Sequence, residues 1–167
     1  MPIRIGHSSI DENGKAVGGN SGDQTKKEVC IRNYYDGNWN RLLRPKDSAL
    51  AEKSALAVEQ ACGNDKIGYD QNQRNTLYNM ALKVDFDLSK IKVPCECDCS
   101  SLIHVAVIAG GANISYGSNG FTTRTMAGIL LKSKEYEELP LGTSLKRGDI
   151  LVREGKHTVM VLEGEVE

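Results

Sequence analysis

The sequence has no apolar run near the ~18 residues that a membrane-spanning helix needs, and it has no excess of charge. Its first residues, MPIRIGHSSIDENG, lack the apolar core of a secretory signal peptide. The formal net charge is −1, and the Lys and Arg residues are scattered along the chain. A nucleic-acid-binding protein would need a concentrated basic surface. We therefore expect synthesis in the cytoplasm and neither a membrane nor a nucleic acid as partner.

The chain also lacks internal repeats and low-complexity tracts. Its 167 residues fit one compact domain, and 40% hydrophobic with 26% charged residues are typical of a soluble globular protein. We predict a single domain over residues 1–167. A turn-rich segment, 1–44, precedes the part that holds the helices and the last strands, 45–167.

Local patterns predict both helices and strands. Gly, Asn and Asp punctuate the first forty residues, and EVCIRNYY between them alternates as a strand does. GDILVRE and HTVMVLE, joined by a tight turn, predict a hairpin. This order predicts the α+β class, with helices packed on a small antiparallel sheet. The expected helices run from Asp47 or Ser48 to Gly63, from about Asp70 through Leu82, from Asp98 to Gly110, and around residues 122–133.

Five cysteines are an odd number, and Cys95, Cys97 and Cys99 alternate within five residues. Such close alternation makes mutual disulfides awkward. Structural zinc sites usually space ligands as C-x(2–4)-C and need a second pair, whereas the spacing here is C-x-C-x-C. Cys30 or Cys62 could complete a four-thiolate set, so a metal clip stays open as an alternative.

Cys99 is the candidate nucleophile. If Asp98 caps the apolar helix, Cys99 is its first residue, where free N–H groups and the helix dipole stabilise a thiolate. The thiol needs a base, and there are three histidines. His104 lies on the same helix but points elsewhere, and His7 lies in a turn-rich start where a solvated role is expected. His157 opens the last strand directly after a turn and is the candidate base.

These motifs resemble the NlpC/P60 superfamily of cysteine peptidases and its CHAP relatives, which share a papain-like core. The resemblance rests on ECDCSSLIHVAV followed by LKRGDILVREGKHTVMVL. The family has Asp-Cys-Ser at the head of a helix, then a GD-hydrophobic strand, then a hairpin that leads to the histidine. Its weaker parts are IGYDQ and TTRT. The whole chain is similar to the catalytic part of phage endolysins and prophage wall hydrolases of Gram-positive hosts.

The resemblance implies a peptidoglycan hydrolase that acts on the cell wall and needs no cofactor or metal. Cys99 would attack an amide of the stem peptide or its link to muramic acid, with His157 as the base. The backbone N–H of Cys99 and Tyr69 would stabilise the oxyanion. Tyr69, Ser100 and Arg124 would line the substrate cleft, and a separate C-terminal wall-binding domain would be a partner outside this chain.

One departure concerns the third catalytic residue, which in the family orients the histidine from the strand after it. This chain stops at Glu167, and Glu163 is too far along an extended strand to reach His157. We therefore expect the strand EVCIRNYY to pair beside the final hairpin and to bring Asn33 to His157.

Two alternatives to the hydrolase remain. The first is a non-enzymatic module, either a cysteine-rich metal clip or a wall-binding domain. The second is a Cys–His acyltransferase, because acyl transfer and hydrolysis share a thioester intermediate.

Overall fold

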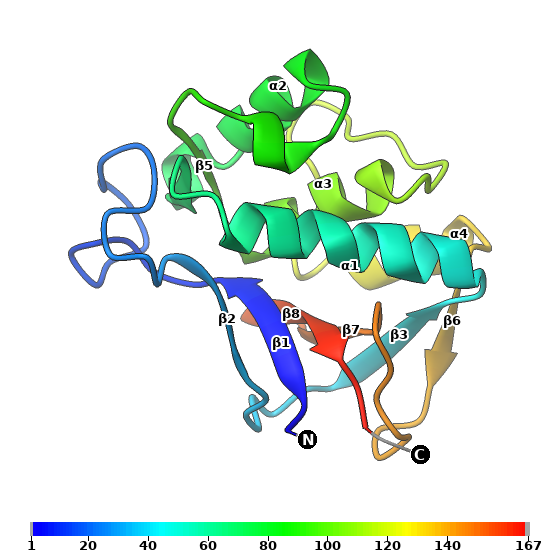
Figure 1. Cartoon of the computed structure of the whole chain (residues 1–167). Coiled ribbons are helices and arrows are strands. Elements are labelled where there is room, and N and C mark those ends of the chain that lie inside the picture. Colours follow the sequence, from blue (N-terminus) through cyan, green and yellow to red (C-terminus); the bar gives the residue numbers. More distant parts are fainter. Residues whose placement is uncertain (1, 166–167) are drawn as a thin grey trace.

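The computed structural model describes residues 2–165 and confirms the α+β class. Helices α1, α3 and α4 cover one face of a six-stranded antiparallel sheet, and α2 lies above them with a two-stranded parallel sheet, β4 and β5 (Figure 1). The strands are β1 (Arg4–Ser8), β2 (Val29–Asn33), β3 (Arg41–Pro45), β4 (Ile67–Tyr69), β5 (Cys95–Cys97), β6 (Tyr136–Leu139), β7 (Ile150–Arg153) and β8 (His157–Glu163). The α-helices are α1 (Ser48–Cys62), α2 (Thr76–Lys83), α3 (Cys99–Ala109) and α4 (Met126–Lys132), and short 3₁₀ helices span Gln71–Gln73 and Leu88–Lys90.

The predicted final hairpin is confirmed as β7 and β8, and Arg153 lies opposite His157 at its tight end. The main sheet has the order β2-β1-β8-β7-β3-β6. EVCIRNYY does contain strand β2, but the expectation that it pairs beside the hairpin is wrong. β1, which the sequence patterns did not predict, lies between β2 and β8 and pairs with both.

Of the next two predicted helices, one follows its local signals and the other begins later than expected. Asp47 caps α1, its side chain accepting from the N–H of Ala49, and Gly63 ends the helix. The expected start of the next helix at Asp70 is wrong. Asp70 caps a 3₁₀ helix instead, and α2 begins only at Thr76.

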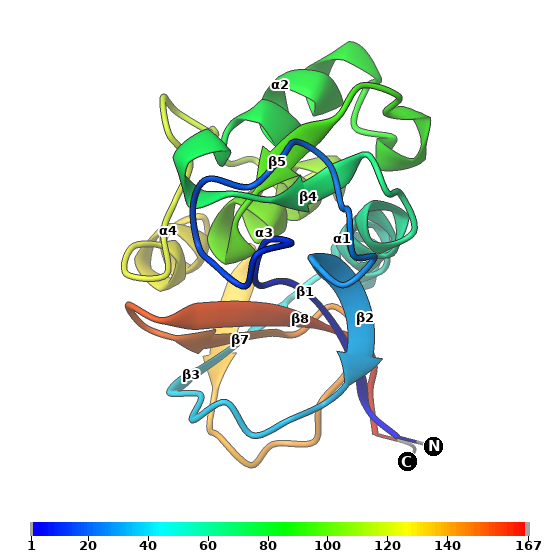
Figure 2. The same ribbon diagram turned by 90° about the vertical axis from the view of Figure 1, so that its left-hand side faces the viewer.

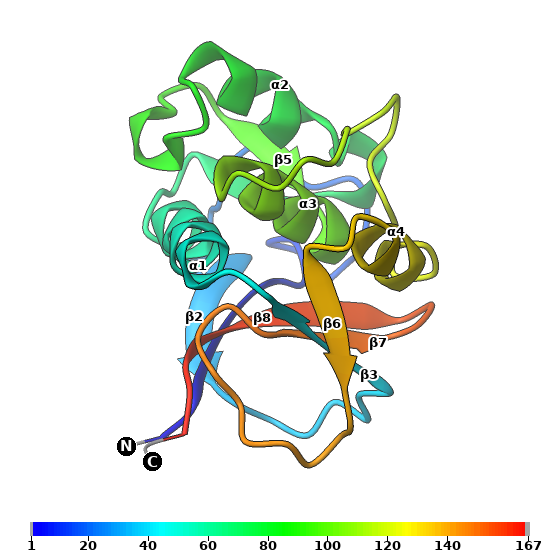
Figure 3. The same ribbon diagram turned by 90° about the vertical axis from the view of Figure 1, so that its right-hand side faces the viewer.

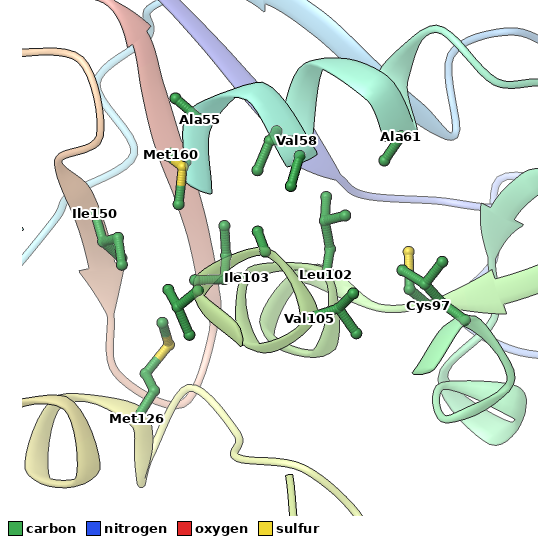
Figure 4. Packing of buried hydrophobic residues seen from close by; sticks show 14 of the residues in the cluster. Ala55, Val58, Ala61, Cys97, Leu102, Ile103, Val105, Met126, Ile150 and Met160 are labelled. Carbon is green, nitrogen blue, oxygen red and sulfur yellow. The ribbon is translucent and has the colours of Figure 1, made fainter. Parts of the chain in front are cut away.

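Helix α3 is the centre of the core, as its almost wholly apolar sequence predicts. Its side chains are buried from Ser100 to Val107, and Gly111 beyond its end takes a positive φ of 101° that suits glycine. Figure 4 shows Leu102 and Ile103 among residues of α1 and the sheet, including Val58 and Met160. Burial on every side fixes the position of the N-terminus of α3 relative to β8.

The turn-rich N-terminal segment is built into the fold. It supplies β1 and β2, and residues 9–28 between them cross beside β4 and β5 (Figure 2). Gln71 N–H donates to Ala16 O at 2.9 Å, and Tyr69 N–H donates to the buried Glu28 carboxylate at 3.0 Å. This loop therefore forms a wall next to the strand that leads into Cys99.

The start of β1 and the end of β8 lie together, on the side of the molecule away from α2 (Figure 3). No helix within residues 2–165 is both long and apolar enough to cross a membrane.

Candidate active site

Cys99 is the first residue of α3, and a complete capping box holds this helix start. The Asp98 carboxylate accepts from the N–H of Ser101 at 2.9 Å, and the Ser101 hydroxyl accepts from the N–H of Asp98 at 2.8 Å. Arg74 binds from behind, donating to Asp98 at 2.8 Å and to the hydroxyl of Ser100 at 3.0 Å. Because Arg74 itself is buried, the backbone on both sides of Cys99 is fixed.

Cys99 is protonated at rest. Burial raises its pKa to about 12 and the neighbouring Asp98 charge adds to the rise, while the backbone amides of Thr158 and Ser100 and the charge of Arg74 lower it. The thiolate expected from the helix start alone is thus outweighed by the cost of burying a charge. An attack by Cys99 therefore needs a base that removes its proton.

His157 is the first residue of β8 and directly precedes Thr158. The backbone N–H of Thr158 is among the groups that lower the pKa of Cys99, which places the start of β8 against the start of α3. The imidazole stacks on Trp39 with ring centroids 6.0 Å apart and an interplanar angle of 28°. The structure thus brings the start of β8, which contains His157, to the N-terminus of α3, which begins at Cys99.

His7 of β1 contacts the imidazole of His157. Its Nδ1 is 3.3 Å from Nε2 of His157 and 3.2 Å from the hydroxyl of Tyr35. His7 is 3% exposed, so the expectation of a solvated residue is wrong. Since Nε2 of His157 is engaged with His7, its Nδ1 is the nitrogen left for the thiol.

Both imidazoles are neutral at physiological pH. Burial lowers the pKa of His157 to about 4, with a further contribution from the Arg32 charge. The pKa of His7 falls to about 3, first through burial and then through His157 and Arg32. A neutral His157 can accept a proton, which is the state a general base needs.

Asn33 does not contact His157 in this structure. It lies opposite Arg4 at the end of β2, and its side-chain oxygen accepts from Arg4 at 2.8 Å. The prediction that Asn33 orients His157 is therefore corrected. β1 occupies the sheet position beside β8 that β2 was expected to hold, so the group next to the imidazole is His7.

The three predicted cleft residues have different surroundings. Tyr69 is buried, its hydroxyl accepts from Gln71 at 2.9 Å, and Cys99 is among the groups that raise its pKa, after burial. Ser100 is buried, and its hydroxyl is held by Arg74 and Asp98. Arg124 is exposed above Gly155 in the β7–β8 turn. Tyr69 is thus near the nucleophile, whereas Ser100 is part of its support.

The other two cysteines of the C-x-C-x-C run lie in the core. Cys95 and Cys97 are 1% and 0% exposed, and the Cys97 thiol donates to the hydroxyl of Ser8 at 3.4 Å. Within residues 2–165, no group of three or more His, Cys, Asp or Glu side chains is placed to hold a metal ion. The geometry gives no support to the metal-clip alternative.

The local patterns missed His7 and Trp39, which contact His157, and Tyr35, which contacts both of them. A weak signal existed for His7, because Ile3, Ile5 and His7 alternate as residues on one face of a strand do. No local signal places that strand beside β8, about 150 residues later.

A family model described as an endolysin-like domain matches residues 5–167, and the chain belongs to that family. Membership indicates a lytic function related to peptidoglycan, as an enzyme that acts on the cell wall. No curated protein and no solved structure matches the chain significantly.

Proposed function

We propose that this protein cleaves an amide bond of peptidoglycan by a Cys–His mechanism, as in the NlpC/P60 and CHAP enzymes it resembles. One observation carries the proposal: Cys99 at the head of a buried helix lies against the start of β8, where His157 is held from behind by His7. The proposed site thus has a nucleophile, a base and a group that positions the base.

The first step forms a thioester. Nδ1 of His157 takes the thiol proton while Sγ of Cys99 attacks the amide carbonyl carbon. The C–N bond then breaks, and the proton on His157 passes to the leaving amine. Water next attacks the thioester with His157 again as base, which releases a carboxylic acid and restores the Cys99 thiol.

Two donors are suited to the oxyanion of the tetrahedral intermediate. The N–H of Cys99 belongs to the first turn of α3, where helix amides have no intrahelical partner. The Tyr69 hydroxyl accepts from Gln71 and therefore has its own proton to donate. The proposed site needs no metal or cofactor.

His7 is the proposed positioning residue. If its Nδ1 accepts from Nε2–H of His157, then Nδ1 of His157 has a lone pair for the thiol proton, which is the tautomer that the mechanism requires. The related superfamily supplies this third group from the strand after the base. Here β1, at the other end of the chain, lies in the neighbouring sheet position.

Thiol labelling tests the nucleophile. Iodoacetamide should stop the lysis of purified Gram-positive walls, and mass spectrometry should show that the loss of lysis follows the adduct on Cys99. Cys95 and Cys97 are closed to solvent, and an adduct on the half-buried Cys30 or Cys62 should leave lysis unchanged. Cys99→Ser should lose lysis, whereas Cys95→Ala and Cys97→Ala should keep most of it per folded molecule. Equal loss in all three variants would contradict the assignment.

Product analysis tests the reaction. Amide hydrolysis should release new amino groups and no new reducing sugar ends, which would instead require a glycosidase. If the protein is an acyltransferase, an added amine should receive the acyl group in place of water, and the acylated amine should appear among the products.

A further inference from the structure

A cavity of about 530 Å³ lies beside the proposed catalytic histidines. Strands β1 and β2 and the ends of the loop between them form its wall, and His7 is part of that wall. Because His7 also contacts Nε2 of His157, the cavity adjoins the base of the proposed site. Its polar lining consists of His7, Ser9, Lys26, Lys27, Cys30 and Arg32.

The charge of this cavity is positive. Lys26 makes only a 3.9 Å contact with the exposed Asp65, and among residues 2–165 no ion pair involves Lys27 or Arg32. Asp23 lies near the cavity, since its charge contributes to raising the pKa of Cys30. Its carboxylate accepts hydrogen bonds from four backbone N–H groups. The positive charges of Lys26, Lys27 and Arg32 are thus not neutralised by a close carboxylate of the described residues.

Arg32 links the cavity to the catalytic pair. Its guanidinium lies over the ring of Tyr35, 4.7 Å from the centroid, and its charge acts on both His7 and His157. A guanidinium stacked by its face on an aromatic ring keeps its edge donors free for a carboxylate. The hydroxyl of the same Tyr35 contacts His7.

We propose that this cavity is a subsite for a carboxylate on the half of the substrate that leaves as the amine. His157 delivers the proton to the leaving amine, so the leaving half lies on the histidine side, where the cavity is. A stem peptide with free carboxylates would then be preferred over one in which they are carboxamides. This inference rests on the proposed function, because it assigns the leaving side from the roles of Cys99 and His157.

Binding of two synthetic ligands tests the subsite independently of turnover. The first is N-acetylmuramoyl-L-Ala-γ-D-Glu-L-Lys-D-Ala, and the second carries D-isoglutamine and a C-terminal carboxamide instead. Calorimetry with the Cys99→Ala protein at low salt should show about tenfold tighter binding of the acidic ligand. Higher ionic strength should reduce the difference, because the charges are open to solvent.

Matched charge variants locate the effect. Lys27→Gln with Arg32→Gln in the Cys99→Ala protein should reduce the preference to threefold or less, as roughly expected for the loss of two rim charges. Lys83→Gln with Lys92→Gln, two exposed lysines on and after α2, should leave it unchanged. Equal affinities for the two ligands, no binding of either at millimolar concentration, or an unchanged preference in the Lys27 and Arg32 variant would overturn the subsite.

Turnover by the unmodified protein separates the two proposals. Cleavage of both ligands at equal rates would overturn the subsite and leave the amidase function standing. Carboxylate-dependent binding without cleavage of ligands or walls would overturn the function and leave a carboxylate-binding cavity.

Discussion

His7 and Asn33 occupy neighbouring strands, yet only His7 reaches His157. We expect His7→Ala to lower kcat by roughly 10²-fold, because His157 loses the group that holds its tautomer and orientation. His7→Gln should recover part of the loss, since its amide oxygen can accept from Nε2–H. Steady-state kinetics on labelled walls would measure both variants.

Asn33→Ala is the matched control for His7. Its side chain is exposed and contacts Arg4, so kcat should stay within about twofold of the parent protein. The assignment of His7 would be wrong if Asn33→Ala lost activity while His7→Ala kept it.

The charge state of His157 sets the acid limit of activity. The base must be neutral, and the pKa of His157 is lowered to about 4, chiefly by burial. We therefore expect kcat/KM to be nearly constant down to about pH 5 and to fall near pH 4, instead of near the ordinary histidine value of about 6.5. Circular dichroism at each pH would show that the protein is still folded, and an acid limb near pH 6.5 would contradict the burial of this base.

At the scale of elements, the cap of α3 has a larger role than the cap of α1. Asp98→Ala removes a capping box and also leaves the buried Arg74 without its carboxylate partner. We expect a loss of about 3 kcal/mol or more in the free energy of unfolding. Asp47→Ala removes only an exposed cap from α1 and should cost about 1 kcal/mol. Urea unfolding would compare them, and equal losses would show that the Arg74 contact contributes nothing.

The elements that sequence patterns predicted correctly are those with local signals. Helices α1 and α3 have a capping aspartate and a glycine stop, and the β7–β8 hairpin closes over a short turn. Strands β1, β3 and β6 are five residues or fewer and pair with segments far away in the chain, so no local pattern marks them. The three-residue strands β4 and β5 are shorter still.

The same distinction divides the candidate site. The positions of Cys99 and His157 at the starts of α3 and β8 could be predicted because each element has a clear sequence pattern. His7 was not, because its role depends on β1 lying beside β8, which is a property of the sheet order. The protonation of Cys99 was also missed, since the degree of burial is set by the packed fold and outweighs the helix dipole.

At the scale of the whole molecule, the three histidines make stability depend on pH. Burial lowers the pKa of His7 to about 3 and those of His104 and His157 to about 4, while the unfolded chain titrates near 6.5. The unfolded state therefore binds more protons, and stability falls as pH decreases from about 6.5 toward 4. We expect a loss on the order of 1–2 kcal/mol per histidine at pH 5 relative to pH 7.5. Urea unfolding at the two pH values would measure it, and equal stability would contradict the burial of neutral imidazoles.

Glu96 acts in the opposite direction. It is 1% exposed, and neither carboxylate oxygen has a hydrogen-bond partner among residues 2–165. Burial, and then the charges of Glu28, Asp70 and Glu12, raise its pKa to about 8. Because the folded state holds this proton more tightly than the unfolded chain, stability decreases as pH rises from about 4.5 through 8.

Glu96→Gln should therefore stabilise the protein above pH 8 and change little at pH 5. Melting temperatures at pH 5 and 8.5 would show this difference between the variant and the parent. A variant that is destabilised equally at both values would show that Glu96 is held as an anion.

The neighbouring positions of β1 and β8 have a consequence for the order of residues along the chain. The start of β1 pairs with the end of β8, Arg4 opposite Glu163, so a short linker could join the two ends and new ends could open at the exposed turn near Asn38. Such a circular permutant would turn β8 and β1 into a hairpin without moving any atom of the site. Its residues would then occur in the order nucleophile, base, positioning histidine, which is the order of the superfamily that the motifs resemble. The proposed site and the site of that superfamily would thus have the same arrangement in space, and their chain orders would be related by a circular permutation.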